Sequence, residues 1–529
     1  MNKMNAFIEK ISPLKVALLA GFVLVLGWSP LPTFPLLFVG IFLLLVLSEK
    51  LENESNRRFV WLFYIAHFIW NIGTTWWVYK ASLGGAIFMI FANSLLQITP
   101  WVLHRFTRSV LGSSKSLILF ICFYIGFEHF HHVWDLSWPW LTLGNSLGSA
   151  PIFAQFYEFT GVAGGSIWIL LGGLALYSKW AKLKFMHPLI AIMVPAVISL
   201  FIFFIRDFDR GEPIQVGLVQ PNFEPHDAKF DIDPLLQLDT MLQQMEKLAQ
   251  QGATLMVLPE TALVGGIDES IPSKDRKLYR LERFIEKHPG IAIMGGCDSY
   301  RIYSEKATAT ARQSRYDENM FYDQYNTGFY IDSLNLRPLY HKAKLVPGTE
   351  IMPYPGVFSF LDKVMISLDG TVNSLGRDYI TLNYYSGDSI AFTPSICYES
   401  IYGDWTAKFV RDGGNIISIM SNDGWWGQTY GYKQLLQYGQ LRAIENRRWI
   451  ARSGNTGISG VISPKGMLSK ASTFWTRDAI LATVYPRTEL TMYTKLGDYI
   501  NRILFLVCLF VIPSVIVKWY VNRKNKTKT

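Results

Sequence analysis

The sequence contains few charged residues and few cysteines. Charged residues make up 17% of the 529 positions, whereas hydrophobic residues make up 50% and aromatic residues 15%. This composition is too apolar for a typical soluble protein and predicts a membrane protein. The cysteines Cys122, Cys297, Cys397 and Cys508 show no C-x-x-C spacing, so they indicate neither a disulfide framework nor a zinc site. The chain also lacks G-x-G-x-x-G and Walker-type sequences, and a nucleotide site is not supported.

Eight apolar runs are long enough, or nearly long enough, to cross about 30 Å of hydrocarbon as helices. They lie at residues 14–28, 32–47, 59–78, 86–103, 117–133, 162–177, 189–205 and 500–519. The first run follows a basic start, as in a signal peptide, but a second run comes almost at once and no small-residue cleavage site separates them. We therefore expect both runs to be retained as membrane helices.

The net charge of +9 comes largely from short basic segments beside the apolar runs. Such segments precede the first run and follow the second, fourth, sixth and eighth: Lys3, Lys10 and Lys15; Lys50, Arg57 and Arg58; Arg105, Arg108 and Lys115; Lys179, Lys182 and Lys184; Lys518, Arg523, Lys524, Lys526 and Lys528. The positive-inside rule then predicts cytoplasmic termini and an external segment between the last two runs, with Lys80 as an exception. This distribution is typical of topology signals, and we expect no nucleic-acid binding.

The external segment has the pattern of an α/β domain. Strand-like runs recur at 214–219, 255–258, 291–294, 326–331, 389–392, 416–420, 449–453 and 457–462, and helical patterns at 235–250, 277–287 and 432–446. This alternation predicts a buried, layered α/β fold. We therefore expect membrane helices at residues 1–205, one external domain at 206–498, and a last membrane helix with a basic tail at 499–529.

Three residues that follow strand-like or loop segments carry side chains suited to thiol chemistry. Cys397 ends the run FTPSIC, Glu260 follows an apolar run, and Lys342 lies in LYHKAKLVPGTE. A cysteine attacks well only as the thiolate, so a base or a cation must lie close to it. Each residue alone has a simpler explanation, since a lone cysteine is usually a small buried hydrophobe, a carboxylate after a strand is often a helix cap, and a loop lysine is usually solvated.

Taken in order with their flanking sequences, these three residues resemble the Glu–Lys–Cys triad of the nitrilase superfamily. The matching sequences are PET at Glu260, Y-x-K followed by L-V-P and Glu350, and C-Y-E at Cys397. Several N-terminal spans, one external domain and one C-terminal span narrow the resemblance to the bacterial apolipoprotein N-acyltransferase family, over nearly the whole chain. WPWLTLGN at 138–145, SNDGWWG at 421–427 and LRAIENRRWIARSGNTGISGVISPKG at 441–466 are also similar to that family.

The resemblance implies an α-β-β-α layered sandwich and about eight transmembrane helices, in the bacterial inner membrane with the catalytic domain on the periplasmic side. It implies that an acyl chain passes from a membrane phospholipid to Cys397 as a thioester, and then to the N-terminal amine of a diacylated apolipoprotein. It implies no cofactor and no metal. The sequence does not give the oligomeric state, and we assume a monomer.

The chemistry suggests a role for each side chain near the thiol. Glu260 would be the general base, a role that calls for a carboxylate whose pKa is raised by burial. Lys342 would stabilise the oxyanion, and Glu350 would position Lys342 or the incoming amine. Tyr398 and Glu399 either orient the loop that carries Cys397 or have only packing and solvent-facing roles.

Several aromatic and histidine residues are weaker candidates. The tryptophans Trp425, Trp426, Trp138 and Trp140 could line the path by which lipids reach the site, although tryptophan belts occur in any membrane protein. Glu128 is followed by His129, His131 and His132, where the family tends to show a basic residue. The histidines have neither the spacing of metal ligands nor a carboxylate partner, so the pattern favours interfacial packing over a metal site.

The chain departs from the family pattern in its lysine loop and in two long segments. The family usually has P-F-G-E where this chain has Pro347, Gly348, Thr349 and Glu350. The segments 299–324 and 362–386 are less familiar.

Two other functions remain open. A membrane-tethered amidase or hydrolase of the nitrilase type would use the same triad and give the acyl group to water; the lipid-facing architecture favours transfer. A transporter or receptor would need intramembrane charges or broken helices, and Glu128 and Glu158 are the only obvious acidic candidates.

Overall fold

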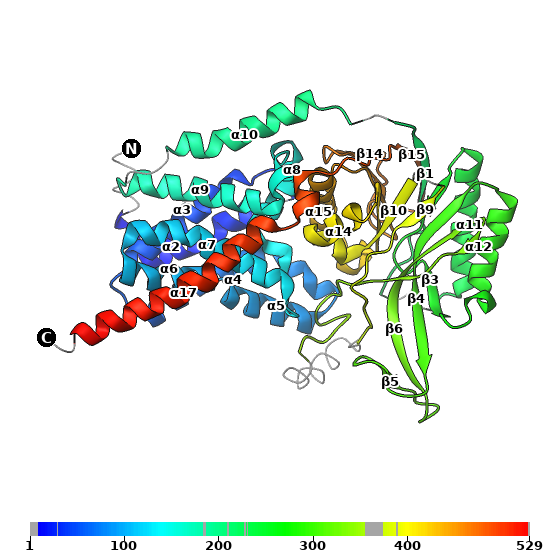
Figure 1. Ribbon diagram of the computed structural model, residues 1–529, viewed down its shortest axis with the longest axis horizontal. Helices are drawn as coiled ribbons and strands as arrows, with labels where there is room; N and C mark the ends of the chain where they lie inside the picture. The colour runs from blue at the N-terminus through cyan, green and yellow to red at the C-terminus, as the bar shows by residue number, and fades with distance from the viewer. Residues whose placement is uncertain are drawn as a thin grey trace. The chain divides into compact units, whose positions relative to one another are not determined.

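The computed structural model divides the chain into two compact units (Figure 1). One unit combines Met1–Tyr79, Gly85–Ile205 and Asp498–Thr529, and the other combines Lys80–Gly84 with Arg206–Gly497. The structure describes residues 9–28, 30–183, 187–208, 211–226, 229, 231–354, 374–387 and 390–526. Among the sequence predictions, Lys3, Lys184, Lys528, Ser389 and residues 362–373 lie outside these ranges.

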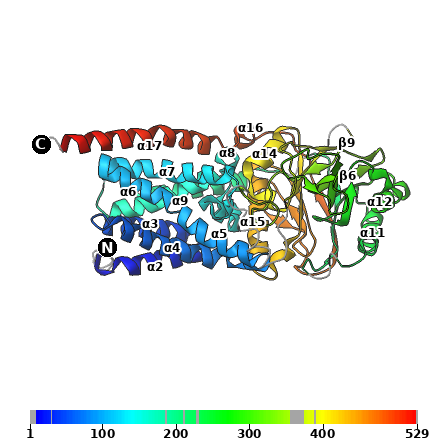
Figure 2. The same ribbon diagram turned by 90° about the horizontal axis from the view of Figure 1, so that it is seen from below.

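The first unit is a bundle of apolar helices. They are α2 (Pro13–Leu26), α3 (Pro35–Lys50), α4 (Asn56–Thr75), α5 (Leu83–Leu96), α6 (Thr99–Leu111), α7 (Ser113–Val133), α8 (Tyr157–Thr160), α9 (Val162–Trp180), α10 (Pro188–Ile205) and α17 (Tyr499–Lys526). Proline stands at the first or second position of α2, α3 and α6, where its missing N–H has no helical partner to lose. The last helix, α17, packs beside α7 (Figure 2).

Each predicted apolar run lies mostly within helix, although several run ends extend beyond it. The run at 86–103 is divided between α5 and α6, because the helix breaks at Gln97 and Ile98 ahead of Pro100. By length and composition, five described helical segments could cross a membrane: Leu83–Leu111, Ser113–Val133, Val162–Trp180, Pro188–Ile205 and Tyr499–Asn525. The shorter Pro13–Leu26 is also apolar. The count of eight spans therefore stays a prediction.

The second unit contains two β-sheets. The nine-stranded sheet has the order β15-β1-β2-β4-β6-β5, with β3 paired to β4 and with β7 and β8 paired to β6. Its strands are β1 (Ile214–Gln220), β2 (Leu255–Val257), β3 (Leu263–Asp268), β4 (Ala292–Tyr303), β5 (Arg312–Gln313), β6 (Phe321–Asp332), β7 (Asn335–Leu336), β8 (Tyr340–His341) and β15 (Asp478–Val484). The six-stranded sheet has the order β14-β13-β12-β11-β10-β9. Its strands are β9 (Tyr384–Ser386), β10 (Ile390–Ile396), β11 (Ile416–Ser421), β12 (Ile450–Gly454), β13 (Gly460–Ile462) and β14 (Leu468–Ser469).

Helices cover the outer faces of the two sheets, and the inner faces pack together through contacts such as β1 against β12 (Figure 1). The helices α11 (Pro234–Gln250) and α12 (Arg276–Lys287) pack on the nine-stranded sheet, and α14 (Gly403–Arg411) and α15 (Gly431–Asn446) pack on the six-stranded sheet. In α11 the buried residues Leu238, Met241, Met245 and Leu248 recur at helical spacing and form one core with β2 and β4. The predicted layered α/β class is confirmed, with parallel pairing at the centre of both sheets.

A candidate active site between strand ends

Cys397 stands directly after β10 and begins a short 3₁₀ helix, Cys397–Ile401. Its φ is 50°, in the left-handed region that non-glycine residues seldom adopt. Backbone strain of this kind costs about 1–3 kcal/mol and persists where the surroundings hold it in place. The side chain is 6% exposed, so the thiol lies in a mostly dry setting.

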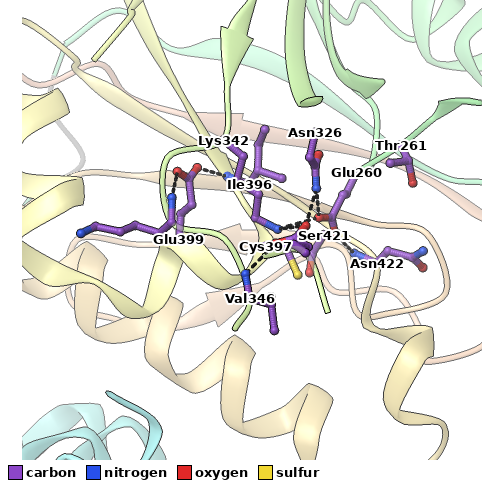
Figure 3. Close-up of polar contacts among 12 residues, drawn as sticks. Glu260, Thr261, Asn326, Lys342, Val346, Ile396, Cys397, Glu399, Ser421 and Asn422 are labelled. Atoms are coloured by element: carbon purple, nitrogen blue, oxygen red, sulfur yellow. Dashed lines mark hydrogen bonds and ion pairs between the residues drawn. The ribbon is translucent and has the colours of Figure 1, made fainter. Parts of the chain in front are cut away.

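Glu260 lies in the turn that follows β2, and its carboxylate is surrounded by donors (Figure 3). Oε1 accepts hydrogen bonds from Asn326 Nδ2 at 2.9 Å and from Lys342 Nζ at 3.1 Å. Oε2 accepts from the backbone N–H of Asn422 at 3.1 Å, and the Cys397 thiol lies near enough to lower the pKa of this carboxylate. The carboxylate thus faces the cysteine with its position fixed by partners from several segments.

Lys342 follows β8 and its ammonium lies between two carboxylates. Nζ is 3.1 Å from Glu260 Oε1 and 2.9 Å from Glu350 Oε1. Asn326 bridges the same two carboxylates, because its Nδ2 also donates to Glu350 Oε1 at 2.9 Å. Val346 N–H donates to Glu350 Oε2 at 2.8 Å, so the departure at Gly348 and Thr349 leaves Glu350 in contact with the lysine. The predicted residues Glu260, Lys342, Cys397 and Glu350 are therefore brought together.

The charges in this site influence one another strongly. Burial alone would raise the pKa of Glu260, but the charge of Lys342 and the hydrogen bonds from Asn326, Lys342 and Cys397 lower it below its ordinary value. The expectation of a raised pKa is thus wrong for this state, because the neighbouring cation outweighs burial. Burial and the charge of Glu260 raise the pKa of Cys397, although Lys342 acts the other way. The pKa of Lys342 is raised because Glu260, Glu350 and Cys397 outweigh the effect of its burial.

Glu399 connects the cysteine strand with the lysine loop. Its buried carboxylate accepts hydrogen bonds at Oε1 from Tyr340 Oη at 2.7 Å and from the N–H groups of Ala343 and Lys344 at 2.7 and 3.1 Å. Its Oε2 accepts from the N–H of Ile396 at 3.0 Å. These contacts flank Lys342 on one side and Cys397 on the other. Of the two readings for Glu399, the geometry therefore favours orientation of the loop.

The aromatic candidates differ in their burial and in the rings that they contact. Tyr398 is buried and contacts the ring of Tyr402 at 5.5 Å in an edge arrangement. Trp425 and Trp426 are half-buried in the short helix Asp423–Trp426, and the ring of His226 lies 5.2 Å from that of Trp425.

The other two tryptophan candidates lie in the helical unit. Trp138 stacks on Trp140 at 5.5 Å, and Trp140 is 1% exposed. Trp140 therefore presents almost no surface to a lipid in this conformation.

The histidines near the end of α7 make polar contacts with neighbouring residues. His131 Nε2 lies 2.9 Å from Asn93 Oδ1, and His132 Nε2 lies 2.7 Å from Thr142 Oγ1. Within the described residues, no cluster of three or more His, Cys, Asp or Glu side chains is arranged to hold a metal ion.

Several residues of the site could not be predicted from the sequence. Asn326 begins a predicted strand, and its neighbours Gln324 and Thr327 are also polar, so it did not stand out in the sequence. Asn422 contributes through its backbone, which no side-chain pattern can indicate. Lys229 is buried beside Glu260, but its neighbours in the sequence give no signal of this.

Two family models match the chain. The model for the apolipoprotein N-acyltransferase N-terminal domain matches residues 20–175, and the model for carbon-nitrogen hydrolase matches residues 215–491, which is more than half of the chain. The chain belongs to the apolipoprotein N-acyltransferase family of the nitrilase superfamily.

Individual relatives agree with this assignment. The apolipoprotein N-acyltransferase of Chlorobaculum tepidum is 27% identical, covering 93% of this chain and 94% of the relative. That of Vibrio parahaemolyticus is 22% identical, covering 99% of this chain and 100% of the relative. Among solved structures, an amidase from Nesterenkonia sp. is 16% identical with a TM-score of 0.38, covering 55% of this chain and 97% of the amidase chain.

Proposed function

We propose that the protein is an acyltransferase that completes lipoprotein maturation. It takes an acyl chain from a membrane phospholipid and transfers it to the N-terminal amine of the diacylglyceryl-cysteine of an apolipoprotein. The single observation that supports this mechanism best is the buried cluster in which Glu260 contacts Lys342 and lies within electrostatic reach of Cys397. The two family models, which together span most of the chain, support the same function.

The first step would form a thioester on Cys397. The Sγ atom attacks the carbonyl carbon of the phospholipid ester while the thiol proton moves to the carboxylate of Glu260. The ester C–O bond then breaks, and Glu260 returns the proton to the glycerol oxygen, which leaves as lysophospholipid. Because the pKa of Cys397 is raised and that of Glu260 is lowered, a free thiolate is unfavourable in the resting site. We therefore expect proton transfer to accompany the attack.

The second step would use the same groups with the amine as nucleophile. The amine nitrogen attacks the thioester carbon and loses a proton to Glu260. The C–S bond breaks, the amide forms, and the proton returns to Sγ. A thioester suits this sequence because it keeps the acyl group reactive while the lysophospholipid leaves and the lipopeptide binds.

Lys342 would stabilise the negative charge that develops on the carbonyl oxygen in both steps. Its ammonium is held by Glu260 and Glu350, so little reorganisation is needed when the oxyanion forms. Glu399 would keep the lysine loop and the cysteine strand in register through its four hydrogen bonds.

The location that fits this activity is the bacterial inner membrane. We propose about eight spans, cytoplasmic termini and a periplasmic catalytic domain, supported by the basic segments and the apolar helices. Trp425, Trp426 and Trp138 are proposed to line the path of the lipid substrates. A monomer would be sufficient, since one chain supplies all four residues of the cluster.

A hydrolase remains the second candidate, because the same cluster could pass the acyl group to water. The test is incubation of the detergent-purified protein with a phospholipid labelled in its acyl chain, followed by addition of a diacylated lipopeptide. We expect a labelled thioester that persists until the lipopeptide is added and then becomes N-acylated product. Release of labelled fatty acid before that addition would favour the hydrolase.

Matched variants assign the chemistry to the cluster. Cys397→Ala and Glu260→Gln should abolish thioester formation. Cys297→Ala is the matched control, since Cys297 is also a buried cysteine. This variant should still form the thioester, because Cys297 lies in the core of the nine-stranded sheet. Formation of N-acylated lipopeptide by Cys397→Ala would contradict the proposed mechanism.

A further inference from the structure

A second buried lysine holds the turn that carries Glu260. Lys229 is 2% exposed, and its Nζ donates to the backbone carbonyl oxygen of Glu260 at 3.1 Å and to Thr261 Oγ1 at 2.6 Å. It thus contacts the main chain of Glu260 and leaves the carboxylate free to face Lys342 and Cys397. No role in the proposed chemistry has so far been given to this ammonium.

The same turn is constrained from its other side. Thr261 has a φ of 46°, and a Cβ atom built on Gly296 would lie 2.6 Å from Thr261 N and 2.8 Å from Glu260 Cα. The turn is therefore fixed between the backbone of β4 and the ammonium of Lys229. A small shift of either support would move the Glu260 carboxylate relative to the cysteine.

Lys229 is also part of a buried charge cluster. Burial lowers the pKa of Lys229 to about 8, although the charges of Asp298 and Glu260 act in the opposite direction. Burial raises the pKa of Asp298 to about 6, with Lys229 lowering it and Glu260 raising it. Burying an ammonium costs free energy, so a lysine kept at this depth beside a reactive carboxylate is more than a solvated loop residue.

We propose that Lys229 is a positioning residue for Glu260, which fixes the turn through the Glu260 carbonyl and Thr261 hydroxyl and stabilises the ionised carboxylate. This inference rests on the proposed role of Glu260 as the general base. Lys229 does not contact the substrate; it acts through Glu260. Its loss should therefore slow thioester formation while leaving the KM for phospholipid close to its original value.

The electrostatic part of this role has a definite sign. Glu260 contacts Lys342, and its charge raises the pKa of both Lys229 and Asp298, so these two groups lie within its electrostatic reach. Removing the positive charge of Lys229 should raise the pKa of Glu260. The acid limb of the pH–rate profile would then move to higher pH.

The test measures thioester formation with acyl-labelled phospholipid between pH 4 and 9 in the full-length protein. The variants are Lys229→Met and, because that change removes a positive charge that lowers the pKa of Asp298, the double variant Lys229→Met/Asp298→Asn. Lys277→Met is the matched control, since Lys277 is also a buried lysine within reach of Asp298, but its Nζ is 3.0 Å from Asp275 and donates to Gly266. Lys229→Arg tests whether a cation restores the profile.

In both Lys229→Met variants we expect at least a tenfold lower rate of thioester formation at neutral pH and a shift of the acid limb to higher pH. In Lys277→Met the acid limb should shift little. In Lys229→Arg the acid limb should move part of the way back to its original position. An unshifted acid limb in both Lys229→Met variants would overturn the inference, as would equal losses in Lys229→Met and Lys277→Met. Glu260→Gln serves as the separate check on the proposed function. If that variant still forms thioester, the base assignment itself fails, whatever Lys229 does.

Discussion

The ammonium of Lys342 lies 3.1 Å from Oε1 of Glu260, although the two residues are 82 positions apart in the sequence. Both side chains are buried, so neither charge is screened by bulk solvent. The pair keeps the carboxylate ionised and the lysine protonated at neutral pH, as the direction of both pKa shifts indicates. The catalytic cluster is thus assembled around an ion pair.

Replacing Lys342 with Met should change both activity and the pH dependence of stability. Without the cation the largest influence that opposes burial is lost, and the pKa of Glu260 should rise above 4.5, its ordinary value. Thioester formation should fall by about 100-fold or more, as for loss of an oxyanion-stabilising group. The measurement is single-turnover labelling of Cys397.

The linkage between protonation and folding gives a second readout for Lys342→Met. In the native protein the lowered pKa of Glu260 contributes stability that is present above about pH 4.5 and is lost as the pH falls through the folded value. In the variant the pKa of Glu260 is raised, so the pH dependence of its contribution to stability is reversed. Lowering the pH from 7 to 5 should therefore stabilise the variant. Thermal unfolding across that range checks the sign, and a variant that loses stability on acidification in the same way as the native protein would contradict it.

Gly296→Ala should impair the site through the backbone of Glu260. The new Cβ would lie 2.6 Å from Thr261 N and 2.8 Å from Glu260 Cα, and backbone atoms cannot move aside as a flexible side chain can. We expect a loss of about 1–3 kcal/mol in stability and a larger proportional loss of activity.

The partner of Gly296 across the sheet provides the control. Gly328 pairs with Gly296 in the β4–β6 register, but the nearest atoms to its built Cβ are at 3.4 Å. Gly328→Ala should therefore keep most of the activity. Comparable inactivation of both variants would show that any added methyl in these strands is harmful, and that close contact with Glu260 is not the cause.

Glu399→Gln should loosen the link between the lysine loop and the cysteine strand. An amide cannot accept all four hydrogen bonds that the carboxylate accepts, and its NH₂ group would face a donor. The expected cost is about 1–3 kcal/mol of stability. Thioester formation per folded molecule should also fall, because Lys342 and Cys397 would no longer be held in register.

Glu445→Gln gives a comparison at a second buried glutamate. Glu445 lies in α15, and its carboxylate pairs with Arg442 of the same helix. Its substitution should lower stability while folded molecules keep their rate. If Glu399→Gln also kept its rate per folded molecule, Glu399 would be only a packing residue.

The sequence was sufficient to predict the layered α/β class and most of its elements. The run at 235–250 is α11 within one residue, because apolar residues at helical spacing need one buried face. The strands β3 and β15, the short strands β5, β7, β8, β9 and β14, and the helices α14 and Met492–Leu496 were missed. The residues of β15 are mostly half-buried, and the strand lies at the edge of the sheet beside β1.

Glu260, Lys342 and Cys397 could be selected from the sequence because each has a chemically suitable side chain and a flanking motif. Their roles stay predictions, although the geometry brings the three together. Asn326, Asn422 and Lys229 could not be selected in this way, since their importance depends on which distant groups they contact.

The sequence by itself determined the apolar helices, the α/β pattern and the reactive side chains, because these depend on composition and on short-range periodicity. Only the tertiary structure decided the charge state of the site. The pKa of Glu260 depends on a balance between burial and the cation of Lys342, and that balance exists only when the ends of β2, β8 and β10 meet.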